Sequence, residues 1–147
     1  MGMFDSFSIS GSGLTAERLR LDLIANNIAN MSTAGRPNDP ANPPYRRKKV
    51  VFSEILRQAG GANPGIPPVE GGGVRVSRIV DDEAPPRLVH EPDHPLADER
   101  GYVAYPNINV VNEIVNMMTA ARSYEANVTA LNAAKDIALK ALEIGRG

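Results

Sequence analysis

The chain of 147 residues contains no cysteine, and this absence excludes disulfide frameworks, thiol catalysis and cysteine-ligated zinc. It also lacks tryptophan, and aromatic residues make up only 5% of the sequence, so a compact core would have few large anchors. Neither sign of charge is in excess, since 16 Lys and Arg stand against 17 Asp and Glu. Proteins that bind nucleic acid are strongly basic, and we therefore expect no nucleic-acid partner.

Long apolar runs are also absent. None approaches the roughly 20 residues that a membrane-spanning helix needs, so we expect no direct membrane insertion. The N-terminal sequence MGMFDSFSISGSG has neither the basic segment nor the apolar core of a secretory signal peptide. If the protein leaves the cytoplasm, we expect it to use another export route.

All 12 prolines lie between residues 37 and 106. Because proline removes a backbone donor and clashes with the preceding helical turn, long helices are confined to the two ends of the chain. The sequence predicts an α+β fold in three parts. These are an N-terminal helical part at residues 1–34, a small Pro/Gly-rich middle region with short strands at residues 35–108, and a C-terminal helical part at residues 109–147.

The N-terminal part predicts a helix over residues 14–31, because apolar residues recur there every three or four positions. One stripe consists of Leu14, Leu21, Ile24, Ala25, Ile28 and Met31, with Leu19 and Leu23 roughly opposite. A helix that is apolar on two faces needs two neighbours. The preceding segment FDSFSISGSG could extend the helix, although its Ser and Gly residues are weak helix formers.

The C-terminal part predicts a longer helix over residues 109–144, with Asn109 as its N-cap. Apolar residues alternate in steps of three and four, as in a coiled-coil seam, and only Lys135 interrupts them. The seam consists of Ile114, Met117, Ala121, Tyr124, Val128, Leu131, Ala138 and Leu142. The small middle region is too short to cover the whole seam of a helix about 45 Å long. We therefore expect the terminal helices to pair as a coiled coil with each other, with a second chain, or with both.

The middle region carries shorter signals. Residues 73–80, GVRVSRIV, alternate apolar and polar side chains, as a half-buried strand does. A short strand, a turn held by prolines and a second strand at residues 102–104 are expected further on. Residues 36–57 carry six bases against two acids, and residues 79–99 carry seven acids against one base. The two segments could complement each other within one chain or between neighbouring chains.

The segment HEPDHP, residues 90–95, contains two histidines and two acids and could be part of a metal-binding module or a metal-dependent hydrolase. Two histidines four residues apart share a face only in a helix, and Pro92 and Pro95 disfavour a helix here. A structural turn whose Asp and His side chains bond the backbone is the simpler interpretation. The sequence contains no G-x-S-x-G nucleophile motif and no phosphate-binding loop, so we expect no enzymatic activity, cofactor or metal.

Three asparagines, Asn26, Asn27 and Asn30, gather near the predicted end of the N-terminal helix. Asparagine is a mediocre helix former, and two interpretations of the cluster remain open. Either the amides cap a fraying helix end, or they hydrogen-bond a partner across a helix interface.

The stretch ANNIANMST, residues 25–33, resembles a motif of the axial proteins of the bacterial flagellum, in which Thr follows closely, here as Thr33. Those proteins also share a C-terminal helix with a pattern like EM-x-x-M-x-x-A-x-R-x-Y-E-x-N. Here the pattern is given by Glu113, Ile114, Met117, Ala120, Arg122, Tyr124, Glu125 and Asn127. The stretch HEPDHPLADERGYVAYPNINV and the short chain are similar to a proximal rod protein of that family.

This resemblance implies a structural subunit of the flagellar rod, the drive shaft that crosses the periplasm. It implies assembly with other copies and other rod proteins through the terminal helices, and export by the flagellar type III apparatus without a cleaved signal peptide. The assembly interface is then expected at Leu14, Leu21, Ile24, Asn26, Asn27, Ile28, Asn30, Ile114, Met117, Ala121, Tyr124, Val128, Leu131 and Leu142. The alternative is a soluble coiled-coil adaptor without a flagellar role.

Overall fold

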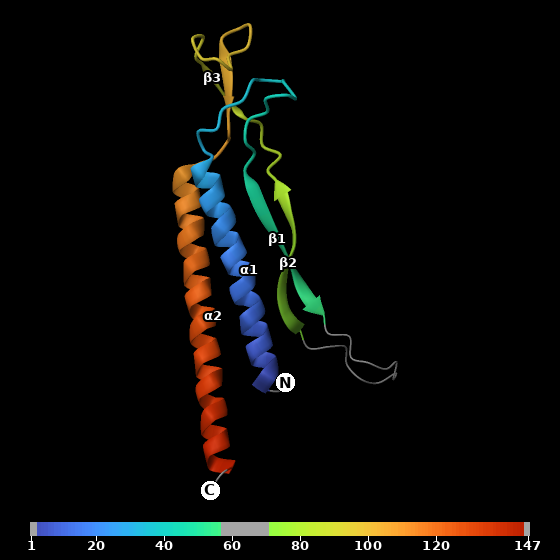
Figure 1. The fold of residues 1–147 in the computed structure, drawn as a ribbon, viewed down its shortest axis with the longest axis vertical. Coiled ribbons are helices and arrows are strands. Elements are labelled where there is room, and N and C mark those ends of the chain that lie inside the picture. The colour runs from blue at the N-terminus through green and yellow to red at the C-terminus, as the bar shows by residue number, and fades with distance from the viewer. Residues whose placement is uncertain (1–2, 57–70, 146–147) are drawn as a thin grey trace, which may run out of the picture. The chain divides into compact units, whose positions relative to one another are not determined.

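The computed structural model describes residues 3–56 and 71–145 (Figure 1). Its elements are α1 (Met3–Ala29), β1 (Lys48–Leu56), β2 (Gly71–Asp81), β3 (Arg87–His90), β4 (Tyr102–Tyr105) and α2 (Val110–Gly145). In this part of the chain β1 pairs with β2, and β3 pairs with β4. The fold is α+β, as the sequence predicts, with the long helices at the two ends of the chain and the strands between them.

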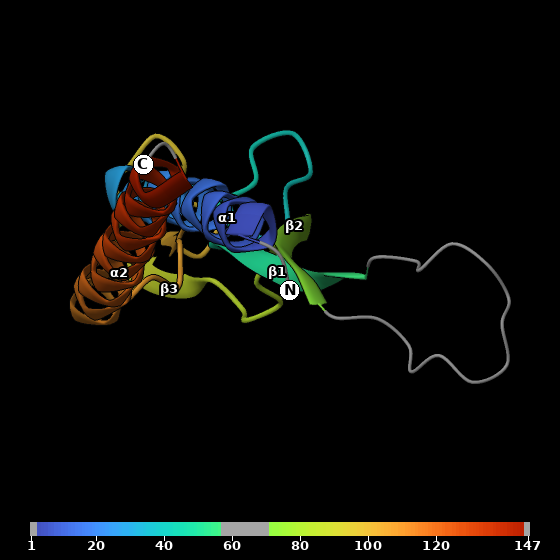
Figure 2. The ribbon, with the colours of Figure 1, turned by 90° about the horizontal axis from the view of Figure 1, so that it is seen from below.

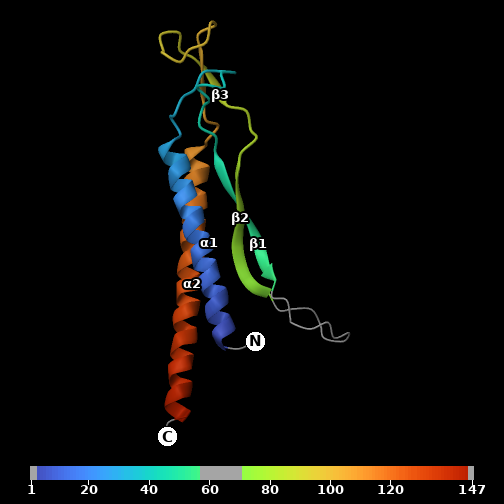
Figure 3. The same ribbon diagram turned by 45° about the vertical axis from the view of Figure 1, so that its right-hand side comes forward.

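The chain divides into two compact units, and each contains a part of both helices and of both longer strands. Unit 1 is built from the described parts of Met1–Leu19, Val51–Arg78 and Ala120–Gly147. Unit 2 is built from Arg20–Val50 and Ile79–Thr119. The paired strands β1 and β2 can be followed side by side in Figures 2 and 3.

The helix α1 begins at Met3, well before the predicted start at residue 14, and ends two residues before the predicted end at residue 31. A tertiary contact within unit 1 explains the longer helix. The Oγ of Ser12 donates to the Ile9 carbonyl at 2.7 Å and accepts the backbone N–H of Val74 in β2 at 3.0 Å. Contacts of this kind outweigh the weak intrinsic helix propensity of the Ser/Gly segment.

Two glycines of unit 1 allow this packing. Gly73 has a φ of 114°, which disfavours any side chain, and a Cβ there would overlap the Oγ of Ser12. Gly13 is buried, and a Cβ there would lie 2.9 Å from the Nδ2 of Asn127 in α2. The backbone of α1 therefore lies close to α2 at Gly13 because this position has no side chain.

The helix α2 starts where the sequence predicts. The Oδ1 of Asn109 accepts the backbone N–H of Asn112 at 3.2 Å, and the Asn109 carbonyl accepts the N–H of Glu113 at 3.0 Å. These two bonds confirm Asn109 as the N-cap.

The buried Leu, Ile, Val and Ala side chains of unit 2 belong to α1 and β4. Leu23 and Ile24 of α1 are buried, and Val103 and Ala104 of β4 are fully inaccessible. Gly35, just after α1, exchanges two backbone hydrogen bonds with Ala104, at 2.8 and 2.9 Å. This bridge ties the segment that leaves α1 to the β3–β4 hairpin.

The HEPDHP segment forms a turn between β3 and β4, whose register pairs Arg87 with Tyr105 and His90 with Tyr102. The Nδ1 of His94 accepts the backbone N–H of Leu96 at 3.1 Å. The Oδ1 of Asp98, further along the loop, accepts the backbone N–H groups of Arg100 at 2.9 Å and Tyr102 at 2.8 Å. The turn is therefore confirmed, with His94 bonding the backbone as expected and with Asp98, which lies beyond HEPDHP, as the aspartate that does so.

Within residues 3–56 and 71–145, no group of three or more His, Cys, Asp or Glu side chains is arranged to hold a metal ion. Among the described helices, none is both long enough and apolar enough to cross a bilayer.

Candidate assembly interface

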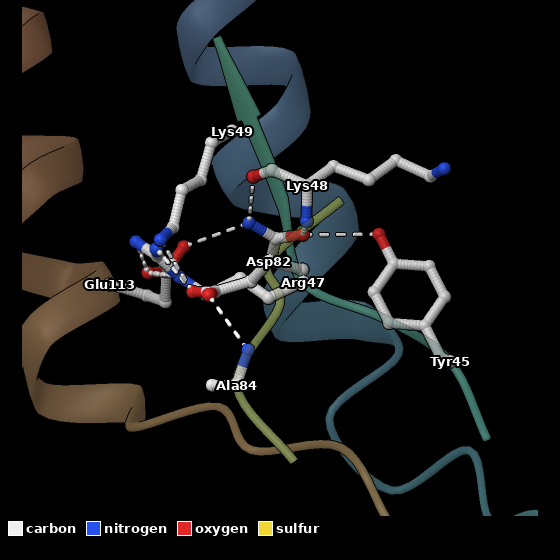
Figure 4. A network of polar contacts seen from close by, with 8 residues as sticks. Tyr45, Arg47, Lys48, Lys49, Asp82, Ala84 and Glu113 are labelled. Carbon is white, nitrogen blue, oxygen red and sulfur yellow. Dashed lines mark hydrogen bonds and ion pairs between the residues drawn. The ribbon is translucent and has the colours of Figure 1, made fainter. Parts of the chain in front are cut away.

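A buried polar cluster lies in unit 2, and we call it the Asn27 cluster. Its members are Asn27, Tyr45, Arg47, Lys48 and Glu113, and Figure 4 draws it with the neighbouring ion pairs. Asn27 of α1 and Glu113 of α2 each expose only 1% of their surface. The cluster therefore joins the two terminal helices through β1 and the segment before it.

Asn27 makes four hydrogen bonds. Its Nδ2 donates to the Lys48 carbonyl at 2.9 Å and to the Oε2 of Glu113 at 3.1 Å. Its Oδ1 accepts the backbone N–H of Lys48 at 2.9 Å and the hydroxyl of Tyr45 at 3.1 Å. A primary amide has two donor hydrogens and two acceptor lone pairs, so the side chain of Asn27 is fully satisfied.

Glu113 is paired with Arg47. The Oε1 of Glu113 accepts from the Nε of Arg47 at 2.8 Å and from its Nη2 at 2.6 Å. Hydrogen bonds between two ionised groups are shorter and stronger than neutral ones. The buried carboxylate of Glu113 is therefore compensated on one oxygen by the guanidinium and on the other by the amide of Asn27.

Ion pairs extend from the cluster along β1 and the end of β2. Arg47 also contacts Asp82 at 3.4 Å, Lys49 contacts Asp82 at 2.7 Å, and Lys48 contacts Asp81 at 3.2 Å. These contacts confirm that the basic and acidic segments complement each other within one chain; Arg57 of the basic segment lies outside the described residues. The Lys48–Asp81 pair is about half exposed, so it contributes little to stability.

Two ionisable groups around the cluster have shifted pKa values. Hydrogen bonds from the Lys49 side chain and the Ala84 backbone lower the pKa of Asp82 below its ordinary value of 3.8. Burial raises the pKa of the Tyr45 hydroxyl above 10.0. Tyr45 therefore keeps its proton and donates to Asn27, and Asp82 stays ionised beside Arg47 and Lys49.

The lowered pKa of Asp82 predicts an acid-sensitive contribution to stability. The unfolded chain binds the proton of Asp82 at a higher pH than the folded chain does, so this contribution is complete above pH 3.8 and is lost as pH falls through the lower folded pKa. We expect Asp82→Asn to reduce the free energy of unfolding at pH 7, and we expect the difference from the unmodified chain to shrink below pH 3.8. Urea unfolding at a series of pH values measures both effects. Lys49→Met removes the principal partner of Asp82, so in a Lys49→Met background the effect of Asp82→Asn on the free energy of unfolding at pH 7 should be smaller. An effect of Asp82→Asn that stays constant down to low pH would contradict the lowered pKa.

The three asparagines have different roles. Asn27 donates to Glu113 of α2, so its amide links two helices of the same chain, as the second interpretation expects. Asn26 and Asn30 bond locally instead, with Nδ2 donating to the carbonyls of Asp22 at 3.2 Å and of Asn26 at 2.9 Å. The amides of these two residues therefore donate hydrogen bonds to backbone carbonyls near the end of α1 itself.

The remaining side chains expected at the interface differ in burial. In the single chain Ile24 is buried, Asn26 is exposed, and Ile114 and Leu142 expose 47% and 67% of their surface. The half-buried ones are Leu14, Leu21, Ile28, Asn30, Met117, Ala121, Tyr124, Val128 and Leu131. Of the rest of the N-terminal stripe, Ala25 and Met31 are exposed.

A row of large apolar side chains on the first turns of α2 is exposed. It consists of Val111, Ile114, Val115 and Met118, which expose between 47% and 68% of their surface. Residues spaced by three and four positions share one side of a helix. One side of α2 in unit 2 therefore presents an apolar surface to solvent.

The sequence interpretation missed the inward positions of α2. Glu113 and Ala120 are buried and Asn127 is half-buried, and these residues lie seven positions apart. Sequence reasoning placed the seam one residue later, at the apolar Ile114, Ala121 and Val128. The seven-residue spacing of Glu113, Ala120 and Asn127 could have indicated the inward side of α2. Two of the three side chains are polar, so a search for apolar residues passed over them.

Two family models match parts of this chain. The family model of the flagella basal body rod protein matches residues 7–35. The model of the C-terminal region of the flagellar basal body rod FlgEFG protein matches residues 99–144. The first match covers most of α1, the second covers β4 and nearly all of α2, and together they define the class of flagellar basal-body rod proteins.

Whole-chain relatives give the particular family. The flagellar basal-body rod protein FlgC of Yersinia enterocolitica is 45% identical over 99% of this chain and 100% of its own length. The FlgC proteins of Borreliella burgdorferi and Bacillus subtilis are each 42% identical, over 100% and 99% of this chain. The chain belongs to the FlgC family of flagellar basal-body rod proteins.

Proposed function

We propose that the protein is a structural subunit of the flagellar basal-body rod that assembles through its terminal helices. Membership of the FlgC family supports the place in the rod. The observation that carries the mode of assembly is the exposed row Val111, Ile114, Val115 and Met118 on α2. A contiguous apolar surface of this kind is typical of a protein–protein contact, and the apolar side of a helix favours a helix of a neighbouring subunit.

In this proposal α1 and α2 pair as an antiparallel coiled coil. One contact in each unit supports the pairing, at Gly13 with Asn127 and at Asn27 with Glu113. Asn27 lies two heptads after Gly13, and Glu113 lies two heptads before Asn127, so a single antiparallel register accounts for both contacts. Residues 1–34 and 109–147 then form the helical core, and residues 35–108 form the middle region.

The proposed interface combines the cluster and the stripes predicted from the sequence. Half-buried side chains of the two helices form the seam within one subunit, and exposed ones such as Ile114 and Leu142 contact neighbouring subunits. The neighbours are other copies of the same chain and other rod proteins. Head-to-tail contacts that do not close on themselves generate a helical assembly, which is the geometry that a rod needs.

The proposal includes the route and the place of assembly. The chain is exported by the flagellar type III apparatus without a cleaved signal peptide and is incorporated into the periplasmic part of the rod. The proposed role is structural, without enzymatic activity, cofactor or membrane insertion. The near-neutral charge is in keeping with the absence of a nucleic-acid partner. A soluble adaptor without a flagellar role is not favoured, because the whole-chain relatives are rod proteins.

A charge on the exposed row tests assembly without disturbing the subunit. Ile114→Asp places a carboxylate on a surface that we expect to be buried between subunits, where an unpaired charge is strongly unfavourable. We expect this variant to fold and to be exported, but to lose rod incorporation and motility. Swimming in soft agar and the amount of the protein in purified basal bodies measure the effect.

The matched control is Thr129→Asp, which introduces the same charge at an exposed position of α2 eleven residues beyond the last member of the row. We expect this variant to retain most of its motility. Equal motility of the two variants at matched export levels would show that the exposed row of α2 is not an interface.

A further inference from the structure

We propose that the buried side chains of Asn27 and Glu113, together with the half-buried Arg47, specify the register in which α1 pairs with α2. This inference rests on the helix pairing proposed above. It states that the three residues select one alignment of α1 with α2 among several. Asn27 and Glu113 are each 99% buried, at a depth where apolar residues are the usual occupants. A polar side chain at such a position is a known means of fixing register between paired helices.

The cluster is complete only in one alignment. Both donors and both lone pairs of the Asn27 amide are used, and both carboxylate oxygens of Glu113 accept hydrogen bonds. In the described part of the chain, no buried side-chain nitrogen or oxygen lacks a partner. Leaving a buried polar group unpaired costs more than a formed hydrogen bond gains, so any alignment that separates Asn27 from Glu113 is disfavoured.

Packing volume near Gly13 does not distinguish the alignments. A slip of one heptad would place Gly13 opposite Ala120 or Ala134 instead of Asn127. Alanine is smaller than asparagine, so Gly13 could face either residue without a clash. Because the apolar pattern of the seam repeats with the heptad, a slipped pair of helices would still bury apolar side chains.

The polar cluster does distinguish them. In one slip Asn27 would face Ala120, and Glu113 would lie beyond the C-terminal end of α1. In the opposite slip Glu113 would face Arg20, but Asn27 would face Pro106, which precedes α2. In both slips the amide of Asn27 loses its partner on α2, and only the observed register keeps the complete cluster.

The absence of cysteine makes the register measurable. Introduced cysteine pairs report which residues face each other in the purified full-length chain under mild oxidation. The native reporter combines Gly13→Cys with Asn127→Cys. The slip reporters combine Gly13→Cys with Ala120→Cys or with Ala134→Cys, and both also carry Asn127→Ser, which removes the amide that a Cβ at position 13 would crowd. Intramolecular disulfides are scored by their mobility in non-reducing gels and by peptide mass.

Each reporter is placed in three backgrounds. With the unmodified cluster, we expect the native reporter to cross-link at least about tenfold more than either slip reporter. The triple variant Asn27→Leu, Arg47→Met and Glu113→Leu keeps the seam apolar, so the helices still pair, and we expect the preference to fall toward equal yields. Arg47→Lys keeps a cationic donor for the Oε1 of Glu113 and leaves the bond from Asn27 to Oε2 in place, and we expect it to retain most of the native preference. Circular dichroism verifies that all three backgrounds have the same helix content.

Two outcomes would overturn the inference. One is an unchanged native preference in the triple variant, which would assign the register to apolar packing. The other is the lack of a native preference in the unmodified chain, including the case in which no reporter cross-links. None of these yields depends on incorporation into a rod, and the motility of the Ile114→Asp variant tests the proposed function separately.

Discussion

Replacing Glu113 with alanine is expected to lower the free energy of unfolding by about 3 kcal/mol. The substitution removes the two bonds from Arg47, at 2.6 and 2.8 Å, and the bond from the Nδ2 of Asn27 at 3.1 Å. The guanidinium of Arg47 loses its buried counter-charge, and the buried amide of Asn27 loses an acceptor. Urea unfolding followed by circular dichroism measures the loss, and the midpoint of thermal unfolding should fall by roughly 10 °C.

The matched control is Glu125→Ala, which removes the same side chain from an exposed position of the same helix. Such surface substitutions usually change stability by no more than about 0.5 kcal/mol. A second variant, Arg47→Met with Glu113→Leu, replaces the ion pair by apolar side chains and should recover part of the loss, because no charge is then buried alone. A loss for Glu113→Ala no larger than that for Glu125→Ala would show that the ion pair is energetically unimportant.

A comparably large effect is expected for Gly35→Ala. A Cβ at this position would overlap the backbone nitrogen of Pro44 and would lie 2.5 Å from the carbonyl carbon of Pro43. Backbone atoms cannot rotate away as a flexible side chain can, so the segment must shift and break the two hydrogen bonds between Gly35 and Ala104. With about 1 kcal/mol for each lost bond and the added strain, we expect a loss of about 3 kcal/mol in urea unfolding.

Gly11→Ala is the control, and its expected effect on the free energy of unfolding has the opposite sign. Gly11 lies inside α1, and a Cβ there would meet nothing within 4 Å. Alanine is favoured over glycine by about 0.5–1 kcal/mol in a helix interior, so Gly11→Ala should stabilise the protein slightly. If the two glycine variants have the same stability, the close approach of the backbone at Gly35 is not a constraint.

Local signals in the sequence were sufficient to predict several elements of the fold. The alternation in residues 73–80 predicts the strand found as β2, and Asn109 marks the start of α2 through its own side chain. Pro92 and Pro95 exclude a helix between β3 and β4 and so predict the turn. In each of these cases the physical cause lies within a few residues of the element.

The candidate site depended on contacts between distant residues. Arg47 and Glu113 are 66 positions apart, and a charged residue taken alone is expected to face solvent. The N-terminal extension of α1 has a similar cause, since the partner of Ser12 is Val74, 62 positions away. Propensity describes a residue in isolation, and it therefore could not predict where a glutamate is buried or a serine-rich segment is helical.

The Asn27 cluster also has a consequence for the way this chain can evolve. Its side chains satisfy one another, so a substitution of Glu113 removes the benefit of retaining Arg47, whereas joint replacement by apolar residues can be nearly neutral. The single substitutions are harmful while the combined one is tolerated, which defines epistasis between positions in the helices and in the middle region. Over evolutionary time Asn27, Arg47 and Glu113 are expected to be kept or exchanged as a set.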